Sequence, residues 1–238
     1  MKEITQDQIY NNHRLATTFH DAGGKNIVIF CHGFRGSSIG PSRFFVKVAR
    51  KLAENNISSL RFDQYCSGNS GGDFLDSSFA DWILTTKKIA QGYIDQGYKV
   101  ALLGQSMGAS AVIAASADIP ELTATVAWVP DPNIDEFAGG AEGFVEEGGQ
   151  LVQNSFWQEA REAKVADKLA KIKIPMYIVQ CTADEFVDEA NRKAISENAQ
   201  PNHQVEIFDG YRHSQWSFEQ SEIVINRTVD FIVQKFKK

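Results

Sequence analysis

The sequence predicts an α/β fold, with a mostly parallel central sheet and helices on both faces. Short runs rich in Val, Ile and Phe alternate along the chain with longer runs whose apolar residues recur at helical spacing. Most of the short runs are continuously apolar, which is typical of strands covered on both faces. The chain has 238 residues, 43% hydrophobic and 23% charged, so we expect one α/β domain spanning residues 1–238.

The expected strands follow one another at regular intervals. The polar start of the chain suits an antiparallel hairpin around Asn11 and Asn12. The apolar runs that follow predict strands at residues 26–31, 58–62, 99–104, 124–129, 176–181 and 204–209. Their alternation with helices implies right-handed crossovers, and active sites in such sheets gather at the carboxyl ends of the strands.

The expected helices lie between these strands. We expect Asp188 to cap a helix over residues 189–198. The last segment opens with Ser217 and Gln220 in capping-box spacing and closes on lysines, which suit a helix C-terminus. An apolar stripe at helical spacing is formed by Phe44, Phe45, Val48 and Leu52.

One stretch, residues 131–171, breaks the alternation. It contains no clear strand, and a Gly- and Glu-rich patch is followed by a helical run from residue 154. We expect this insertion to form a packed lid. Phe144 and Trp157 are predicted to line an apolar or aromatic substrate pocket together with Phe34. The alternative, that the aromatic residues of the lid fill only its own core, stays open.

Charge and cysteine content argue against several kinds of partner. The net charge is −6 and the basic residues are scattered, so neither nucleic acid nor a membrane surface is an expected partner. The N-terminus lacks an apolar signal-peptide core and no run of roughly eighteen apolar residues occurs, so we expect a soluble cytoplasmic protein. The three cysteines, Cys31, Cys66 and Cys181, fit neither a disulfide framework nor a zinc site.

The pentapeptide GQSMG, residues 104–108, is the first candidate for chemistry. A serine hydroxyl is a weak nucleophile and needs an exposed position with a base within hydrogen-bond reach. A strand-to-helix turn lifts Ser106 out, and Gly104 and Gly108 remove side chains that would collide there. The helix that follows directs the positive end of its dipole toward Ser106. Taken alone, the pentapeptide also fits plain packing of a strand against a helix.

A second candidate, HGF at residues 32–34, follows the first apolar strand. A tetrahedral intermediate needs two backbone N–H donors, and this loop can place one opposite the amide that follows the nucleophile. The amides of Phe34 and Met107 are therefore the predicted oxyanion hole. His32 and Gly33 are expected to shape the loop, with His32 bonding to its backbone and not acting as the base.

The base and its carboxylate are expected late in the chain. Of the five histidines, His213 alone follows a late strand on a glycine-containing loop before the terminal helix, so we predict that it is the base. Asp184 comes soon after the preceding strand and is predicted to orient the imidazole and stabilise the imidazolium. Asp131, after an earlier strand, is the reserve candidate for this carboxylate.

Four motifs give a family resemblance that covers nearly the whole chain: HGF at 32–34, RFDQYCSGNSGG at 61–72, GQSMG at 104–108, and the pair TADEFV and GYRHS near the end. With the chain order Ser106, Asp184, His213, the sequence resembles the α/β-hydrolase superfamily, in particular bacterial carboxylesterases similar to the cinnamoyl and feruloyl esterases. The resemblance implies that Asp63 braces the loop beneath the oxyanion residues. Cys66 departs from it, because relatives often carry Gly or His there.

Together these features predict a carboxylesterase that cleaves short-chain or aromatic acyl esters through an acyl-enzyme. Such a reaction needs a small-molecule ester as substrate and neither a cofactor nor a metal. A homodimer is a possible assembly of the chain. A thioesterase or a small peptidase has the same catalytic requirements, so both stay open. A binding protein that keeps the fold without the chemistry would lack a nucleophile, base or acid, and all three candidates are present.

Overall fold

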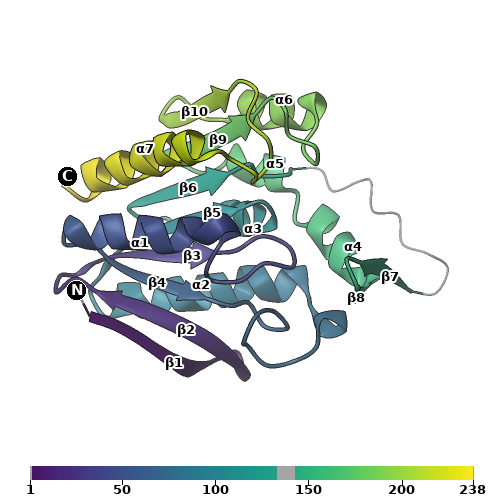
Figure 1. Ribbon diagram of the computed structural model, residues 1–238, viewed down its shortest axis with the longest axis horizontal. Coiled ribbons are helices and arrows are strands. Elements are labelled where there is room, and N and C mark those ends of the chain that lie inside the picture. Colours follow the sequence, from purple (N-terminus) through teal and green to yellow (C-terminus); the bar gives the residue numbers. More distant parts are fainter. Residues whose placement is uncertain (1, 133–142, 238) are drawn as a thin grey trace.

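The computed structural model describes residues 2–132 and 143–237, and in this part of the chain its centre is one eight-stranded sheet (Figure 1). The strand order is β1-β2-β4-β3-β5-β6-β9-β10, and neighbours from β4 to β10 are parallel. The predicted α/β class is confirmed, and all six predicted strands are present with ends within one residue. The strands are β1 (Lys2–Tyr10), β2 (His13–Asp21), β3 (Asn26–Cys31), β4 (Ser58–Phe62), β5 (Lys99–Gln105), β6 (Ala124–Trp128), β9 (Met176–Cys181) and β10 (His203–Phe208).

The expected hairpin forms one edge of the sheet. Tyr10 of β1 pairs with His13 of β2 across a two-residue turn, and both turn residues have positive φ, 51° at Asn11 and 64° at Asn12. Asn tolerates this left-handed backbone better than most residues, and a turn of this kind matches the twist of the two strands. The hairpin joins the sheet through antiparallel pairing of β2 with β4.

Helices cover both faces of the sheet (Figure 1). One face is covered by α1 (Phe44–Glu54) and α7 (Phe218–Phe236). Short 3-10 helices occur at η1 (Pro41–Arg43) and η2 (Phe74–Asp76). The other face is covered by α2 (Phe79–Asp95), α3 (Met107–Ser116), α5 (Val165–Leu169) and α6 (Glu189–Asn198).

The predicted helix caps are confirmed. The Asp188 carboxylate accepts a hydrogen bond from the Asn191 amide (2.7 Å) at the start of α6. At the start of α7, Ser217 and Gln220 bond reciprocally as a capping box. These bonds satisfy amides that have no partner inside the helix, so the sequence fixes where both helices begin.

The parallel strands are buried on both faces, which explains their continuously apolar sequences. Every residue of β4, β6 and β9 is buried. Trp128 of β6 is fully buried, and its indole N–H donates to the Thr228 hydroxyl of α7 (2.9 Å), so this helix is fixed to the sheet by packing and by a hydrogen bond. Truncating a side chain of this size in such a core costs about 3–5 kcal/mol.

The expectation that residues 131–171 contain no strand is wrong for residues 144–153. β7 (Phe144–Glu147) and β8 (Gln150–Gln153) form an antiparallel hairpin before α4 (Asn154–Glu162). Gly148 and Gly149 form its two-residue turn, both with positive φ (56° and 78°), the conformation that glycine adopts at no steric cost. Residues 133–142 of the predicted lid lie outside the described residues.

The lid segment after residue 142 lies at the carboxyl end of the parallel strands (Figure 1). Glu159 of α4 accepts hydrogen bonds from the Ser78 hydroxyl (2.7 Å) and the Ala80 amide (3.0 Å) at the start of α2, which ties the lid to the domain. Across residues 2–132 and 143–237, no helix combines the length and the apolar character that crossing a membrane requires.

Candidate active site

Ser106 occupies the turn between β5 and α3 in a strained backbone conformation, φ 55° and ψ −124°. Its amide donates to the Trp128 carbonyl (2.9 Å), which holds the turn against the neighbouring strand. Such a conformation costs about 1–3 kcal/mol and persists only where its surroundings enforce it. The predicted strand-to-helix turn is therefore present, with Ser106 at its tip.

The two glycines of GQSMG allow an unusually close approach of backbone to backbone. A Cβ on Gly104 would lie 2.2 Å from the Gly108 carbonyl oxygen, and a Cβ on Gly108 would lie 2.2 Å from the Cys31 carbonyl oxygen. Rigid backbone atoms cannot yield at such distances, so only glycine fits. The packing and the catalytic interpretation of the motif are thus compatible, because the close packing is what positions Ser106.

His213 lies beside Ser106, as predicted. Its Nε2 is 2.8 Å from the Ser106 hydroxyl oxygen, and its Nδ1 is 2.8 Å from a carboxylate oxygen of Asp184. An ionised carboxylate only accepts, so Nδ1 carries the proton and Nε2 accepts from the serine hydroxyl. Three side chains from distant parts of the chain therefore form one continuous hydrogen-bonded series.

Asp184 is held as a buried anion. Its side chain is 1% exposed, and its second oxygen accepts from the amides of Phe186 (2.9 Å) and Val187 (2.8 Å). These bonds fix the carboxylate and stabilise its charge. Asp131, the reserve candidate, is not the partner of His213; it lines the same cavity, and its carbonyl accepts from the Ser110 hydroxyl.

Side chains that the sequence did not assign position the His213 loop. Glu185 accepts from the His213 amide (3.2 Å) and from the Arg212 guanidinium (2.9 Å). Burial opposes ionisation of Glu185, but backbone hydrogen bonds and Arg212 outweigh it and lower the pKa of this carboxyl. The Gln105 amide N–H donates to the hydroxyl of Ser214 (2.7 Å), which joins the serine turn to the histidine loop.

The expected supporting role of His32 agrees with its contacts. His32 is buried, its Nδ1–H donates to the Gly33 carbonyl (2.8 Å), and its Nε2 accepts from the Gln64 amide (3.0 Å). Because Nε2 accepts a hydrogen bond, the ring is neutral, and burial lowers the pKa of His32. A Cβ on Gly33 would lie 2.5 Å from Oε1 of Gln105, so this loop packs directly on the serine turn.

The predicted oxyanion donors flank this contact. Phe34 follows Gly33 in the loop, and Met107 is the first residue of α3. No acceptor in the described part of the chain is bonded to either amide. Both amides therefore remain the predicted donors to an oxyanion formed at Ser106.

Asp63 braces this region, as the resemblance implies. It is 2% exposed, and its two carboxylate oxygens accept from the amides of Ser38 (2.6 Å) and Asn69 (2.8 Å). One buried anion therefore links the loop after Phe34 to the loop at residues 66–72. Cys66 has a positive φ of 69°, a conformation that glycine adopts at no steric cost.

A cavity of about 720 Å³, which we call the catalytic cavity, opens over Ser106 and His213. Phe34 lines it and packs against Trp157 with ring centres 4.6 Å apart; Trp157 also lines the cavity and is almost fully buried. Phe144, which we predicted to bind substrate, is not among its lining residues. Phe144 lies on β7, and other lid residues, Glu147 and Gln150, reach the cavity instead.

His203 lies outside the catalytic cavity: it is the first residue of β10, and its ring bonds to the Ile172 carbonyl and the Gln200 amide. Among the described residues, no group of three His, Cys, Asp or Glu side chains could hold a metal ion.

This geometry defines a class of protein. A serine on a strand–helix turn, bonded through a histidine to a buried carboxylate at the carboxyl edge of a mostly parallel sheet, is the arrangement of a serine hydrolase with the α/β-hydrolase fold. The model of the family described as serine aminopeptidase, S33, matches residues 23–146, more than half of the chain. The protein belongs to this serine aminopeptidase S33 family.

Solved structures share the fold over almost the whole chain. Est1E from Butyrivibrio proteoclasticus, with ferulic acid bound, matches with a TM-score of 0.85 at 22% identity, over 98% of this chain and 100% of that one. A monoacylglycerol lipase from Paleococcus ferrophilus matches at 0.76 and 17%, over 93% and 99% of the two chains. An esterase from Pyrococcus furiosus matches at 0.74 and 22%, over 98% and 91%. Comparison with curated proteins found no match.

Proposed function

We propose that the protein is a carboxylesterase that cleaves esters of short-chain or aromatic acids by way of an acyl-enzyme. The observation that carries the proposal is the series of two 2.8 Å hydrogen bonds from Ser106 through His213 to Asp184. The aromatic side chains in the catalytic cavity, Phe34 and Trp157 among them, support an apolar or aromatic acyl group.

The first half of the reaction forms the acyl-enzyme. The Ser106 oxygen attacks the ester carbonyl while His213 Nε2 takes its proton, and Asp184 stabilises the resulting imidazolium. The amides of Phe34 and Met107 bind the oxyanion, a contribution typically worth about 100- to 1000-fold in rate for each donor. The tetrahedral intermediate collapses as His213 gives its proton to the departing alcohol.

The second half regenerates the enzyme. Water loses a proton to His213 as it attacks the acyl-enzyme, and the same two amides bind the second oxyanion. The intermediate then releases the acid, and the proton returns from His213 to Ser106. Each step reuses the same donors, so the reaction needs only the ester and water.

A panel of substrates tests this assignment. We expect hydrolysis of p-nitrophenyl acetate and butyrate and of methyl ferulate, with acyl-CoA and aminoacyl p-nitroanilides assayed beside them. Ser106→Ala is expected to abolish hydrolysis of every substrate that the wild type cleaves. Activity confined to acyl-CoA or aminoacyl substrates would overturn the ester assignment, and full activity of Ser106→Ala would overturn the mechanism.

A peptidase is the second candidate, and the family match favours it. The family is described as serine aminopeptidase, and the same hydroxyl, imidazole and carboxylate can cleave amides. Asp131 and Glu147 line the catalytic cavity. Carboxyl groups like theirs bind the ammonium group of an aminopeptidase substrate. Preference for aminoacyl p-nitroanilides over the p-nitrophenyl esters would select this function.

A further inference from the structure

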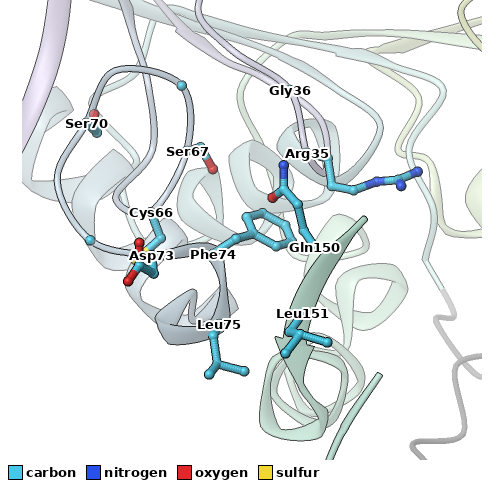
Figure 2. Close-up of a pocket in the computed structure, with 12 residues that line it drawn as sticks. Arg35, Gly36, Cys66, Ser67, Ser70, Asp73, Phe74, Leu75, Gln150 and Leu151 are labelled. Atoms are coloured by element: carbon cyan, nitrogen blue, oxygen red, sulfur yellow. The ribbon is translucent and has the colours of Figure 1, made fainter. Parts of the chain in front are cut away.

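A second cavity, of about 390 Å³, adjoins the catalytic cavity (Figure 2). Both are lined by Arg35, Gly36, Gly68 and Gln150, so the two lie next to each other. The loop at residues 66–75 forms one wall of the second cavity, and Gln150 and Leu151 of β8 form another. We call this space the side cavity.

The side cavity contains a buried hydroxyl without a partner. Ser67 lines it and is 7% exposed, and its hydroxyl has no hydrogen-bond partner among the described residues. Its backbone is fixed, because the Ser67 amide donates to the Gln64 carbonyl (3.0 Å) and its carbonyl accepts from the Ser70 amide (3.0 Å). An unpaired buried hydroxyl costs about 1–3 kcal/mol, so a ligand that satisfies it gains a favourable contact.

The groups that face the side cavity are neutral. Figure 2 shows the Ser67 hydroxyl directed toward the side of the cavity occupied by Gln150 and Phe74, and the guanidinium of Arg35 directed away from them. Arg35 and Asp73 are exposed and carry opposite charges, so the rim has no net charge. A hydroxyl, a carboxamide and an aromatic ring suit a ligand that is uncharged and rich in hydroxyl groups.

We propose that the side cavity binds the alcohol part of the ester and selects alcohols with several hydroxyl groups over alkyl alcohols. This inference rests on the proposed esterase function. In the catalytic cavity, Phe34 and Trp157 form an aromatic wall suited to the acyl group, which leaves the side cavity for the alcohol. One hydroxyl of the bound alcohol forms a hydrogen bond with the Ser67 hydroxyl. The exposed side chain of Gln150 moves to form a hydrogen bond with a second hydroxyl of the alcohol.

A pair of substrates with the same acyl group and alcohols of similar size tests the inference. We expect kcat/KM for glyceryl butyrate to exceed that for propyl butyrate by about 10-fold in the wild type, the effect of one to two additional hydrogen bonds. Ser67→Ala should lower this ratio about 3- to 10-fold. Gln150→Leu, at an exposed position, should lower it as well and serves if Ser67→Ala does not fold.

Ser70→Ala is the matched control. Ser70 lines the same wall, but its hydroxyl already donates to the Asp63 carbonyl (2.6 Å) and accepts from the Ala16 amide (2.9 Å). Its loss should therefore lower the melting temperature and leave the ratio of the two substrates unchanged. Ser67→Ala removes no hydrogen bond within the protein and should not lower the melting temperature.

The outcomes separate failure of this inference from failure of the esterase proposal. Wild-type protein without activity on p-nitrophenyl acetate would refute the esterase function. An active wild type whose ratio does not change in Ser67→Ala or Gln150→Leu would refute the side cavity as the alcohol site. The substrates p-nitrophenyl butyrate and p-nitrophenyl 3-hydroxybutyrate differ only in the acyl group. If Ser67→Ala changed the preference between them, the side cavity as the alcohol site would also be refuted.

Discussion

At the level of single residues, the site depends on contacts that fix three loops in position relative to one another. Gln105 is 6% exposed and lies between two of them: its Oε1 is against Gly33 of the oxyanion loop, and its amide N–H donates to Ser214 beside His213. A buried side chain with these two neighbours can fix the imidazole relative to the serine turn. Gln105 is thus a positioning residue, since it acts through Ser214 and not on the reacting atoms.

Removing this link should lower the rate without weakening substrate binding. We expect Gln105→Leu and Ser214→Ala each to reduce kcat on p-nitrophenyl acetate about 3- to 10-fold with little change in KM, the loss expected for one hydrogen bond. Because both variants break the same bond, the double variant should be no slower than the slower single variant. Additive losses, or changes confined to KM, would contradict the positioning role.

The sequence predicts the geometry of the triad better than that of its supports. Chain order and the places of Ser106, Asp184 and His213 after their strands suffice to predict that these residues meet, because parallel strands end at one edge. Gln105 stands inside the GQSMG motif, and Ser214 follows the predicted base, yet the bond between them depends on side-chain directions that spacing does not encode. Phe144 was assigned to the pocket from its aromatic character alone, which does not show which way a lid strand faces.

At the scale of elements, the lid after residue 142 is fixed to the domain by aromatic packing and by one carboxylate. Phe156 of α4 packs against Phe34 (ring centres 5.3 Å apart) and Trp82 (5.5 Å). Glu159, one turn further along α4, bonds to Ser78 and Ala80 at the start of α2. Phe34, the predicted oxyanion residue, is therefore supported by packing against the predicted lid.

Glu159 should contribute to stability where a neighbouring glutamate does not. We expect Glu159→Ala to lower the free energy of unfolding by about 1–2 kcal/mol, because the first turn of α2 loses an acceptor. The control is Glu162→Ala on the same helix. Within the described part of the chain, its carboxylate accepts only from exposed Gln158, so its loss should change stability by less than about 0.5 kcal/mol. Equal effects in urea unfolding would show that Glu159 does not anchor the lid.

The β7–β8 hairpin is not predicted from the sequence because its strands are short and its turn lies in an irregular-looking patch. Its strands have four residues each, and the Gly148–Gly149 turn stands within a Gly- and Glu-rich patch that resembles an irregular loop. A Gly-Gly pair between two short apolar-containing runs is nonetheless a hairpin signal. Strand β8 of this hairpin also packs against η2, and the local sequence does not predict such a long-range contact.

At the scale of the whole molecule, a buried histidine makes stability depend on pH. His20 of β2 is fully buried; its Nε2 accepts from Arg61 Nε (3.1 Å) and Nη2 (3.0 Å), and its Nδ1 is 3.7 Å from Glu3. Burial, followed by the charge of Arg61, lowers the pKa of His20 to about 4, while Glu3 opposes this and Arg50 adds to it. The folded protein therefore holds His20 neutral.

This shift predicts acid destabilisation. The unfolded chain has the ordinary histidine pKa of about 6.5 and binds the proton more readily, so the stabilisation is complete above that pH and is lost as pH falls toward about 4. We expect the His20 contribution to this loss to approach roughly 3 kcal/mol. His20→Gln, which keeps an acceptor for Arg61, should flatten the curve of unfolding free energy between pH 6.5 and 4. An unchanged curve would contradict this account.

The central claim is that His213 activates the hydroxyl of Ser106. Labelling with a fluorophosphonate, followed by mass spectrometry of the digested protein, tests it most directly, with His213→Ala treated in parallel. We expect one adduct, on Ser106, formed at least about 1000-fold more slowly in His213→Ala. An adduct on another residue, or equal labelling rates in the two proteins, would contradict it.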